Sequence, residues 1–178
     1  MEMENQKKST IKVVSDLRSG DSKTVLAAIK KIEQLADEVF VLPLLEFYRD
    51  TDDENAKETV KEMLSTLKVS GGEDALVSAL GSLDFAGIQG DILFFIWHSG
   101  FQPVDHIHLV CKIAVDGDFM TAFEALTLIE SLGGPVNDDS LMEGLMIVRG
   151  FLADNKEHPH RELIFNLFQV LTTFENQG

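Results

Sequence analysis

The apolar residues of this chain recur at a nearly fixed spacing, and this repeat limits what the chain can fold into. Four apolar positions, Ala28, Val60, Ile92 and Ala125, are separated by 32, 32 and 33 residues. Four residues further along, the same alignment gives Ile32, Leu64, Ile96 and Ile129, and three beyond these it gives Leu35, Leu67, Ser99 and Leu132. A period of this length is the sequence signature of stacked supersecondary units. A fifth, incomplete unit is predicted at Ile164, Phe168 and Leu171.

Within each unit the apolar residues are spaced three and four apart, which is typical of a helix with one buried face. No run alternates with the period of two that indicates a strand. Between the aligned helices we predict partner helices at about 39–49, 73–83, 104–115 and 139–153. Leu45, Leu80, Val110 and Leu145 are expected to face the shared core from them. The chain is therefore predicted to be all-α, with about nine or ten helices of roughly 10 to 16 residues.

Polar and glycine residues between these segments match the ends of helices. Aspartates accept backbone N–H groups where a helix begins, and the candidates are Asp21, Asp53, Asp118 and Asp138. Glycines suit the left-handed position where a helix ends, and the candidates are Gly20, Gly71, Gly100 and Gly133.

One helical hairpin cannot bury its own apolar face, so neighbouring hairpins are expected to stack. We predict an α-solenoid, a superhelix of about four to five antiparallel helical hairpins. A chain of 178 residues is the length of one domain. The prediction is a single domain over residues 1–178, in which residues 1–9 form a mobile N-terminal segment.

Residues 92–97, "ILFFIW", are six apolar residues in a row. A membrane-spanning helix needs roughly 20, so this run is too short. A helix that is apolar most of the way round is typically buried. We predict a helix in the middle of the stack, with Phe94 and Phe95 on opposite flanks. The alternative is that one flank is exposed and makes a dimer contact.

Residues 41–67, "VLPLLEFYRDTDDENAKETVKEMLSTL", resemble a HEAT or armadillo-type repeat of the short bacterial kind. The resemblance rests on the "LPLL" opening, the turn with Asp50 and Asp52, and the spacing of Val60, Met63, Leu64 and Leu67. Lys57 matches the basic residue that often follows the turn, whereas Val25, Gln89 and Thr121 occupy that place in the other units. The resemblance implies a curved superhelix whose second helices line the concave side. Proteins of this kind usually bind other proteins, and a few are enzymes or lyases.

The charge of the chain narrows the class of partner. Fifteen lysines and arginines oppose 30 aspartates and glutamates, a formal charge of −15. A field of this sign repels phosphate and anionic lipid head groups, so we expect neither nucleic acid nor a membrane as partner. The N-terminus lacks the apolar core of a signal peptide, and Cys111 is the only cysteine. A cytoplasmic protein is expected.

No catalytic or ligand-binding motif is present, and no cofactor is expected. The histidine pairs His106/His108 and His158/His160 have a spacing of two, which points side chains apart on a helix. The second pair lies in a turn, where convergence is possible, but the further ligands that zinc requires are lacking. We therefore expect no metal, and the alternative that His158 and His160 bind one stays open.

The segment "SLMEGLMIVRGFL", residues 140–152, has more apolar residues than one buried face requires. Leu141, Leu145, Val148 and Leu152 form one face, and Met142, Met146 and Phe151 are surplus to it. Methionine adapts to varied partner shapes, so these residues indicate a groove for a peptide or helix. The alternative is that the fifth unit covers them. Polar residues expected on the same concave surface are Glu46, Arg49, His106, Lys112, Glu143 and Arg149.

These observations predict a non-enzymatic scaffold or adaptor that binds a protein or peptide of basic character on its concave helix surface. The first alternative is a small HEAT-like enzyme or lyase subunit that holds a ligand in the concave groove. Either form is expected as a monomer or as an end-to-end homodimer. Phe165, Phe168 and Phe174 would mark the end cap of such a dimer.

Overall fold

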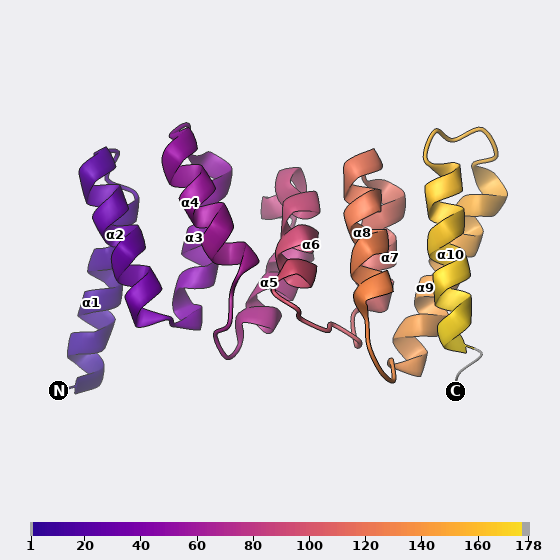
Figure 1. Ribbon diagram of the computed structural model, residues 1–178, viewed down its shortest axis with the longest axis horizontal. Helices are drawn as coiled ribbons and strands as arrows, with labels where there is room; N and C mark the ends of the chain where they lie inside the picture. Colours follow the sequence, from indigo (N-terminus) through magenta and orange to yellow (C-terminus); the bar gives the residue numbers. More distant parts are fainter. Residues whose placement is uncertain (1, 176–178) are drawn as a thin grey trace. The chain divides into compact units, whose positions relative to one another are not determined.

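The computed structural model describes residues 2–175, with side chains from Lys8 onward. These residues form ten α-helices and two short 3-10 helices and contain no strand, which confirms the all-α prediction (Figure 1). The elements are α1 (Glu2–Leu17), α2 (Ser22–Leu35), η1 (Glu38–Phe40), α3 (Val41–Asp50), α4 (Glu54–Ser65), α5 (Gly72–Leu80), η2 (Leu83–Ile88), α6 (Gln89–His98), α7 (Ile107–Asp116), α8 (Phe119–Ser131), α9 (Asp138–Asp154) and α10 (Arg161–Glu175).

The contacts within the chain divide it into two compact units, Met1–Leu76 and Val77–Gly178. The boundary falls inside α5. A single domain over residues 1–178 stays a prediction. The segment 1–9, predicted to be mobile, belongs to α1 from residue 2 onward, and residue 1 lies outside the described residues. Its mobility likewise stays a prediction.

In unit 1, α2 packs on both α1 and α4, and α3 packs on α4. The predicted repeat positions Ala28 and Ile32 of α2 and Val60 and Leu64 of α4 are all buried. Side chains that accept backbone N–H groups define where two of these helices begin. Asp21 accepts from Thr24 at the start of α2, and Asp53 accepts from Asn55 and Ala56 at the start of α4.

Unit 2 has two layers of helices. In one layer α6 packs on α8 and α8 packs on α10, and in the other α7 packs on α9. Figure 1 shows α8 and α10 in front of α7 and α9. The two layers are joined by the contacts of α7 with α8 and of α9 with α10. The aligned positions Ile92, Ile96, Ala125 and Ile129 are buried in the first layer, and Val110 and Leu145 are buried in the second.

The pairing of helices into hairpins differs from the sequence prediction. The predicted units paired α8 with α9, whereas α8 makes its extensive hairpin contact with the preceding helix α7, as α4 does with α3. Short turns explain the difference, because residues 51–53 and 117–118 are all that separate these pairs. The predicted residues Glu46, Arg49, Lys112, Met142 and Met146 therefore lie on first helices of hairpins, not on second helices.

The apolar run at residues 92–97 forms most of α6. Ile92, Leu93, Phe95 and Ile96 are completely buried, which confirms the prediction of burial for these four residues. Phe94 and Trp97 are half-buried, so one flank of α6 reaches the surface. Among the described residues, no single helix has the length and hydropathy to cross a membrane. Only α5 taken together with the segment Leu83–His98 meets both criteria, and the two are sharply bent at their junction.

Three predicted details of helix ends are wrong. Leu35, aligned with buried positions in other units, is 47% exposed, because α2 ends there and Ala36 turns into the left-handed region with φ of 46°. Asn137, not Asp138, caps α9 by accepting from the backbone N–H of Ser140. Gly134, with φ of 110°, takes the positive φ predicted for Gly133. Gly20, Gly71 and Gly100 have the expected positive φ.

A glycine permits the close approach of α9 to α7. A Cβ atom built at Gly144 would lie 3.0 Å from Cys111 Sγ and 3.2 Å from Ile107 Cγ2. Gly150 of the same helix has no atom within 4 Å of such a Cβ position. The two glycines of α9 thus differ in what surrounds them, although both lie in the helix interior.

We expect Gly144→Leu to lower the free energy of unfolding by about 1–3 kcal/mol, because the side chain must push α9 away from α7. The matched variant Gly150→Leu is expected to leave stability unchanged or to raise it by up to about 1 kcal/mol, since glycine is a poor helix former. Urea denaturation of both variants measures the two changes. Equal effects of the two substitutions would contradict the packing of α7 on α9.

Candidate functional site

A cleft of about 680 Å³ opens in unit 1 where the ends of α1 and α3 meet the starts of α2 and α4. Its apolar lining comes from Leu17, Val25 and Phe47. Its charged lining consists of two guanidinium groups, Arg18 and Arg49, and four carboxylates, Glu46, Asp50, Asp52 and Asp53. The carboxylates outnumber the guanidinium groups, so the cleft is acidic at neutral pH.

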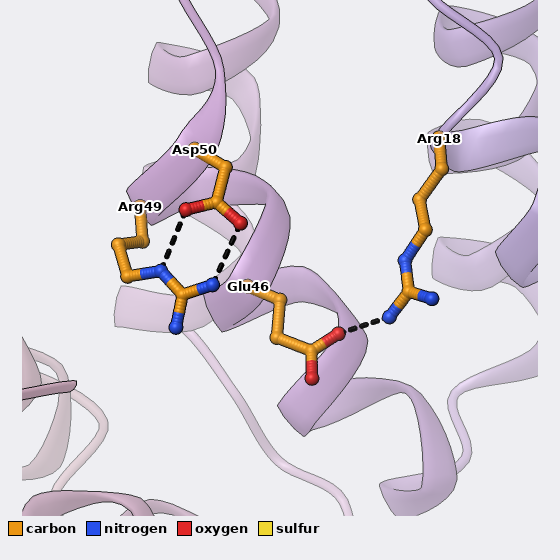
Figure 2. Close-up of polar contacts among 4 residues, drawn as sticks. All are labelled: Arg18, Glu46, Arg49 and Asp50. Carbon is orange, nitrogen blue, oxygen red and sulfur yellow. Dashed lines mark hydrogen bonds and ion pairs between the residues drawn. The ribbon is translucent and has the colours of Figure 1, made fainter. Parts of the chain in front are cut away.

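The charged groups of the cleft are largely paired with one another (Figure 2). Arg49 donates to Asp50 through two parallel hydrogen bonds, from Nε to Oδ1 at 2.6 Å and from its terminal nitrogen to Oδ2 at 2.7 Å. Arg18, which follows α1, forms an ion pair with Glu46 of α3. The hydrogen bonds from Arg49 lower the pKa of Asp50, burial opposes them, and the charges of Arg49 and Arg18 lower the pKa further.

Two residues predicted to bind a partner, Glu46 and Arg49, therefore line one cleft, but each is engaged by another side chain of unit 1. The side chain of Arg18 is 59% exposed and that of Glu46 is 38% exposed. Ion pairs this exposed stabilise weakly because water screens them. A charged ligand that entered the cleft could therefore separate Arg18 from Glu46 at little cost in free energy.

The other predicted residues lie on the α7/α9 layer of unit 2. Met142 and Met146 are one turn apart on α9 and are 51% and 67% exposed. The alternative that the last hairpin covers them is therefore wrong for these two residues, whereas Phe151 is half-buried and packs on His158, with ring centroids 5.0 Å apart. Glu143 and Arg149 of α9 and Lys112 of α7 are also exposed.

His106 is half-buried and directly precedes α7. The residues on either side of it in the sequence, Asp105 and His108, form hydrogen bonds that join the start of α7 to the start of α9. Ser140 Oγ accepts from the backbone N–H of His108 at 3.2 Å and lies 2.9 Å from His108 Nδ1. Asn137 donates to Asp105 at 2.9 Å. The structure thus brings six predicted residues to one layer of unit 2, whereas Glu46 and Arg49 belong to unit 1.

The histidines and the cysteine do not form a metal-binding cluster in the part of the chain whose side chains are described. No group of three or more His, Cys, Asp or Glu residues there is arranged to hold a metal ion. His158 Nδ1 accepts from the backbone N–H of His160 at 3.2 Å, and the two rings are 5.0 Å apart between centroids. His158 thus serves as a local cap in the turn before α10.

Sequence reasoning missed an exposed apolar surface on α8. Phe119, Met120 and Phe123 are 50%, 57% and 45% exposed. It also missed how unevenly charge is distributed. Unit 2 has four lysines and arginines against fourteen aspartates and glutamates, a formal charge of −10, and residues 69–148 contain a single basic residue, Lys112. Counting charge by region instead of over the whole chain would have revealed this.

Comparisons with known proteins return no match for this chain, either among protein-family models, among curated proteins or among solved structures.

We expect Cys111 to be unreactive in the folded chain. It is buried against α9, and burial raises the pKa of its thiol to about 12. Since the thiolate is the reactive species, a thiol-specific reagent at pH 8 should label the folded chain slowly and the chain in guanidinium chloride at once. Rapid labelling of the folded chain would contradict the tight packing of α7 on α9.

Proposed function

We propose that this chain is a non-enzymatic interaction module that binds a protein or peptide of basic character on a helical surface of unit 2. The observation that carries the proposal is the exposure of Met142 and Met146, one turn apart on α9, in a unit with a formal charge of −10. Exposed large apolar residues at helical spacing offer the kind of surface onto which an amphipathic segment docks.

The chemistry of this surface suits an adaptable binding site. Methionine side chains are flexible and polarizable, so they fit partners of different shape. Glu143 lies between the two methionines in sequence and is exposed. A basic partner would gain apolar contact from the methionines and attraction from the acidic field, and its association would weaken as salt is added.

A HEAT-type solenoid is part of the same proposal. Its support is the stacking of like helices in unit 2, α6 on α8, α8 on α10 and α7 on α9, at the spacing of the sequence repeat. A monomer or an end-to-end homodimer, in the cytoplasm and without nucleic acid or membrane as partner, completes the proposal. The charge of −15 supports the last two points because it repels phosphate and anionic lipid.

The test is affinity capture from an extract of the native host at low and moderate salt, with the double variant Met142→Glu, Met146→Glu. We expect a stoichiometric, salt-sensitive partner that the double variant loses. The two added carboxylates attract a basic partner, so a loss of binding must come from the lost apolar contact.

The matched control is Leu26→Glu, Leu83→Glu, which adds the same charge at two other exposed leucines. It should keep the partner. A partner retained by the methionine variant, or lost equally by both variants, would refute the assignment to α9. No partner from a folded chain at either salt concentration would refute the interaction module itself.

The cleft of unit 1 favours a second candidate function, a small ligand-binding subunit of an enzyme or lyase. Its volume of about 680 Å³ lies within the usual range for small-molecule sites. A ligand there would meet both guanidinium groups and the apolar lining. A thermal-shift screen of metabolites against the wild-type chain and the double variant Arg18→Gln, Arg49→Gln tests this candidate. A rise in melting temperature that the variant loses is expected, and a screen without any such ligand would remove this candidate.

A further inference from the structure

We propose that the outward face of α6 and α8 is a second docking surface, and that its partner is a basic, amphipathic helical segment of another protein. This surface lies on the opposite layer of unit 2 from the exposed methionines of α9. The inference goes beyond the proposed function and does not depend on it.

The side of α8 that faces away from the core is apolar where a surface helix is ordinarily polar. Its buried face is formed by Ala122, Ala125, Leu126, Leu128 and Ile129. Phe119, Met120 and Phe123 project away from this face, and about half of each side chain is exposed. Three large apolar side chains within two turns form a contiguous patch, which in a protein of this size marks a site of interaction.

Two side chains extend this patch onto α6. Trp97 of α6 is half-buried and donates from Nε1 to Glu124 Oε2 of α8 at 2.7 Å. Phe94 packs edge-on against Trp97, with ring centroids 5.4 Å apart. Glu124 lies one turn from Met120 on the same helix. Trp97 therefore borders the α8 patch at Glu124, whereas Phe119 contacts His160 in the turn before α10, with ring centroids 5.6 Å apart.

A glycine permits the two helices to lie this close. A Cβ atom built at Gly90 of α6 would lie 3.1 Å from Thr121 Oγ1 and 3.5 Å from Thr121 Cα of α8. The surface is thus held by direct helix contact, and a partner would meet it already formed.

Charge determines which partner fits. Neither α6 nor α8 contains a lysine or arginine, whereas Asp91, Glu124 and Glu130 lie on these helices and Asp118 caps α8. The four lysines and arginines of unit 2 lie on other elements, Lys112 on α7, Arg149 on α9, Lys156 in the turn before α10 and Arg161 at its start. Two histidines adjoin the patch, His98 at the end of α6 and His160 against Phe119. The apolar patch is therefore surrounded by negative charge from its own helices.

This combination selects among the possible occupants. An anionic membrane or a nucleic acid would be repelled, and a second copy of this chain would have the same charge of −15. An amphipathic helix with an apolar stripe and flanking lysines or arginines matches both features, since its apolar side chains cover the patch and its charges face the carboxylates.

The experiment uses the full chain and a fluorescein-labelled synthetic peptide of about 18 leucines and lysines arranged as an amphipathic helix, a length at which an isolated helix is stable. Fluorescence anisotropy gives its affinity for the wild-type chain and for the double variant Met120→Ser, Phe123→Ser. The control variant Leu26→Ser, Leu83→Ser removes two exposed leucines that lie outside α6, α8 and α9. Each chain is also measured with Met142→Ser, Met146→Ser present, so that the α9 surface does not contribute to binding. A second peptide, with glutamate in place of every lysine, tests whether binding requires a positively charged helix.

We expect the α8 variant to bind the basic peptide at least about tenfold more weakly than the wild type, as loss of central apolar contacts does at other interfaces. The control variant should bind as the wild type does, and the glutamate peptide should not bind. Equal affinity of the α8 variant and the wild type, an equal loss in both variants, or comparable binding of the glutamate peptide would each overturn the proposal.

A substitution that reverses a charge without removing apolar contact tests the surface even if the α8 variant does not fold. Glu130 is exposed on α8, and Glu130→Lys should lower the affinity for the basic peptide severalfold. The helical circular dichroism signal and the unfolding midpoint of this variant should stay unchanged. An unchanged affinity would overturn the electrostatic part of the proposal. Because the α8 variant is also measured with Met142 and Met146 replaced, the outcome for this surface can be distinguished from the outcome for the methionines of α9.

Discussion

Contact between like helices of adjacent hairpins is the interaction on which unit 2 depends. Three of its helices are short, with 10 residues in α6 and α7 and 13 in α8, and isolated helices of this length are marginal in water. Each is stabilised by burying one face against a neighbour. Small residues set how close the neighbours come, Gly90 between α6 and α8 and Gly144 between α7 and α9. The faces that remain outside these contacts are the surfaces available to partners.

Much of this arrangement was predictable because the buried positions are occupied by apolar residues at a regular spacing in the sequence. Ala28, Val60, Ile92 and Ala125 are all buried, as their spacing predicts. Periodicity failed where a local backbone event ends a helix. Ala36 adopts a left-handed conformation without being glycine, so nothing at that position signalled that Leu35 would be exposed. Periodicity also does not report which neighbouring helix is the hairpin partner, because that depends on turn length, and the turn at residues 117–118 joins α7 to α8.

The candidate surfaces were predictable to a different extent. Met142 and Met146 were surplus to a clear apolar stripe, and they are exposed. The patch on α8 was not predictable in this way. The sequence of α8 is apolar around most of its circumference, so it does not show which apolar residues belong to the buried face and which are left over. Only the positions of α6 and α10, which pack on α8, leave Phe119, Met120 and Phe123 exposed. The pairing of Arg49 with Asp50 depends likewise on side-chain geometry that spacing does not encode.

The acidity of unit 2 and its exposed apolar side chains have a common physical consequence. Exposed aromatic and methionine side chains favour association between copies of a chain. A formal charge of −10 on the unit opposes this association, because approaching copies repel one another before apolar contact is made. The same field attracts a basic segment. The charge that opposes self-association is therefore also the feature that would attract the proposed basic partner, and lysine and arginine are absent from α6 and α8, where the apolar patch lies. Adding basic residues there would weaken both effects together, since self-repulsion and attraction of a basic helix arise from the same carboxylates.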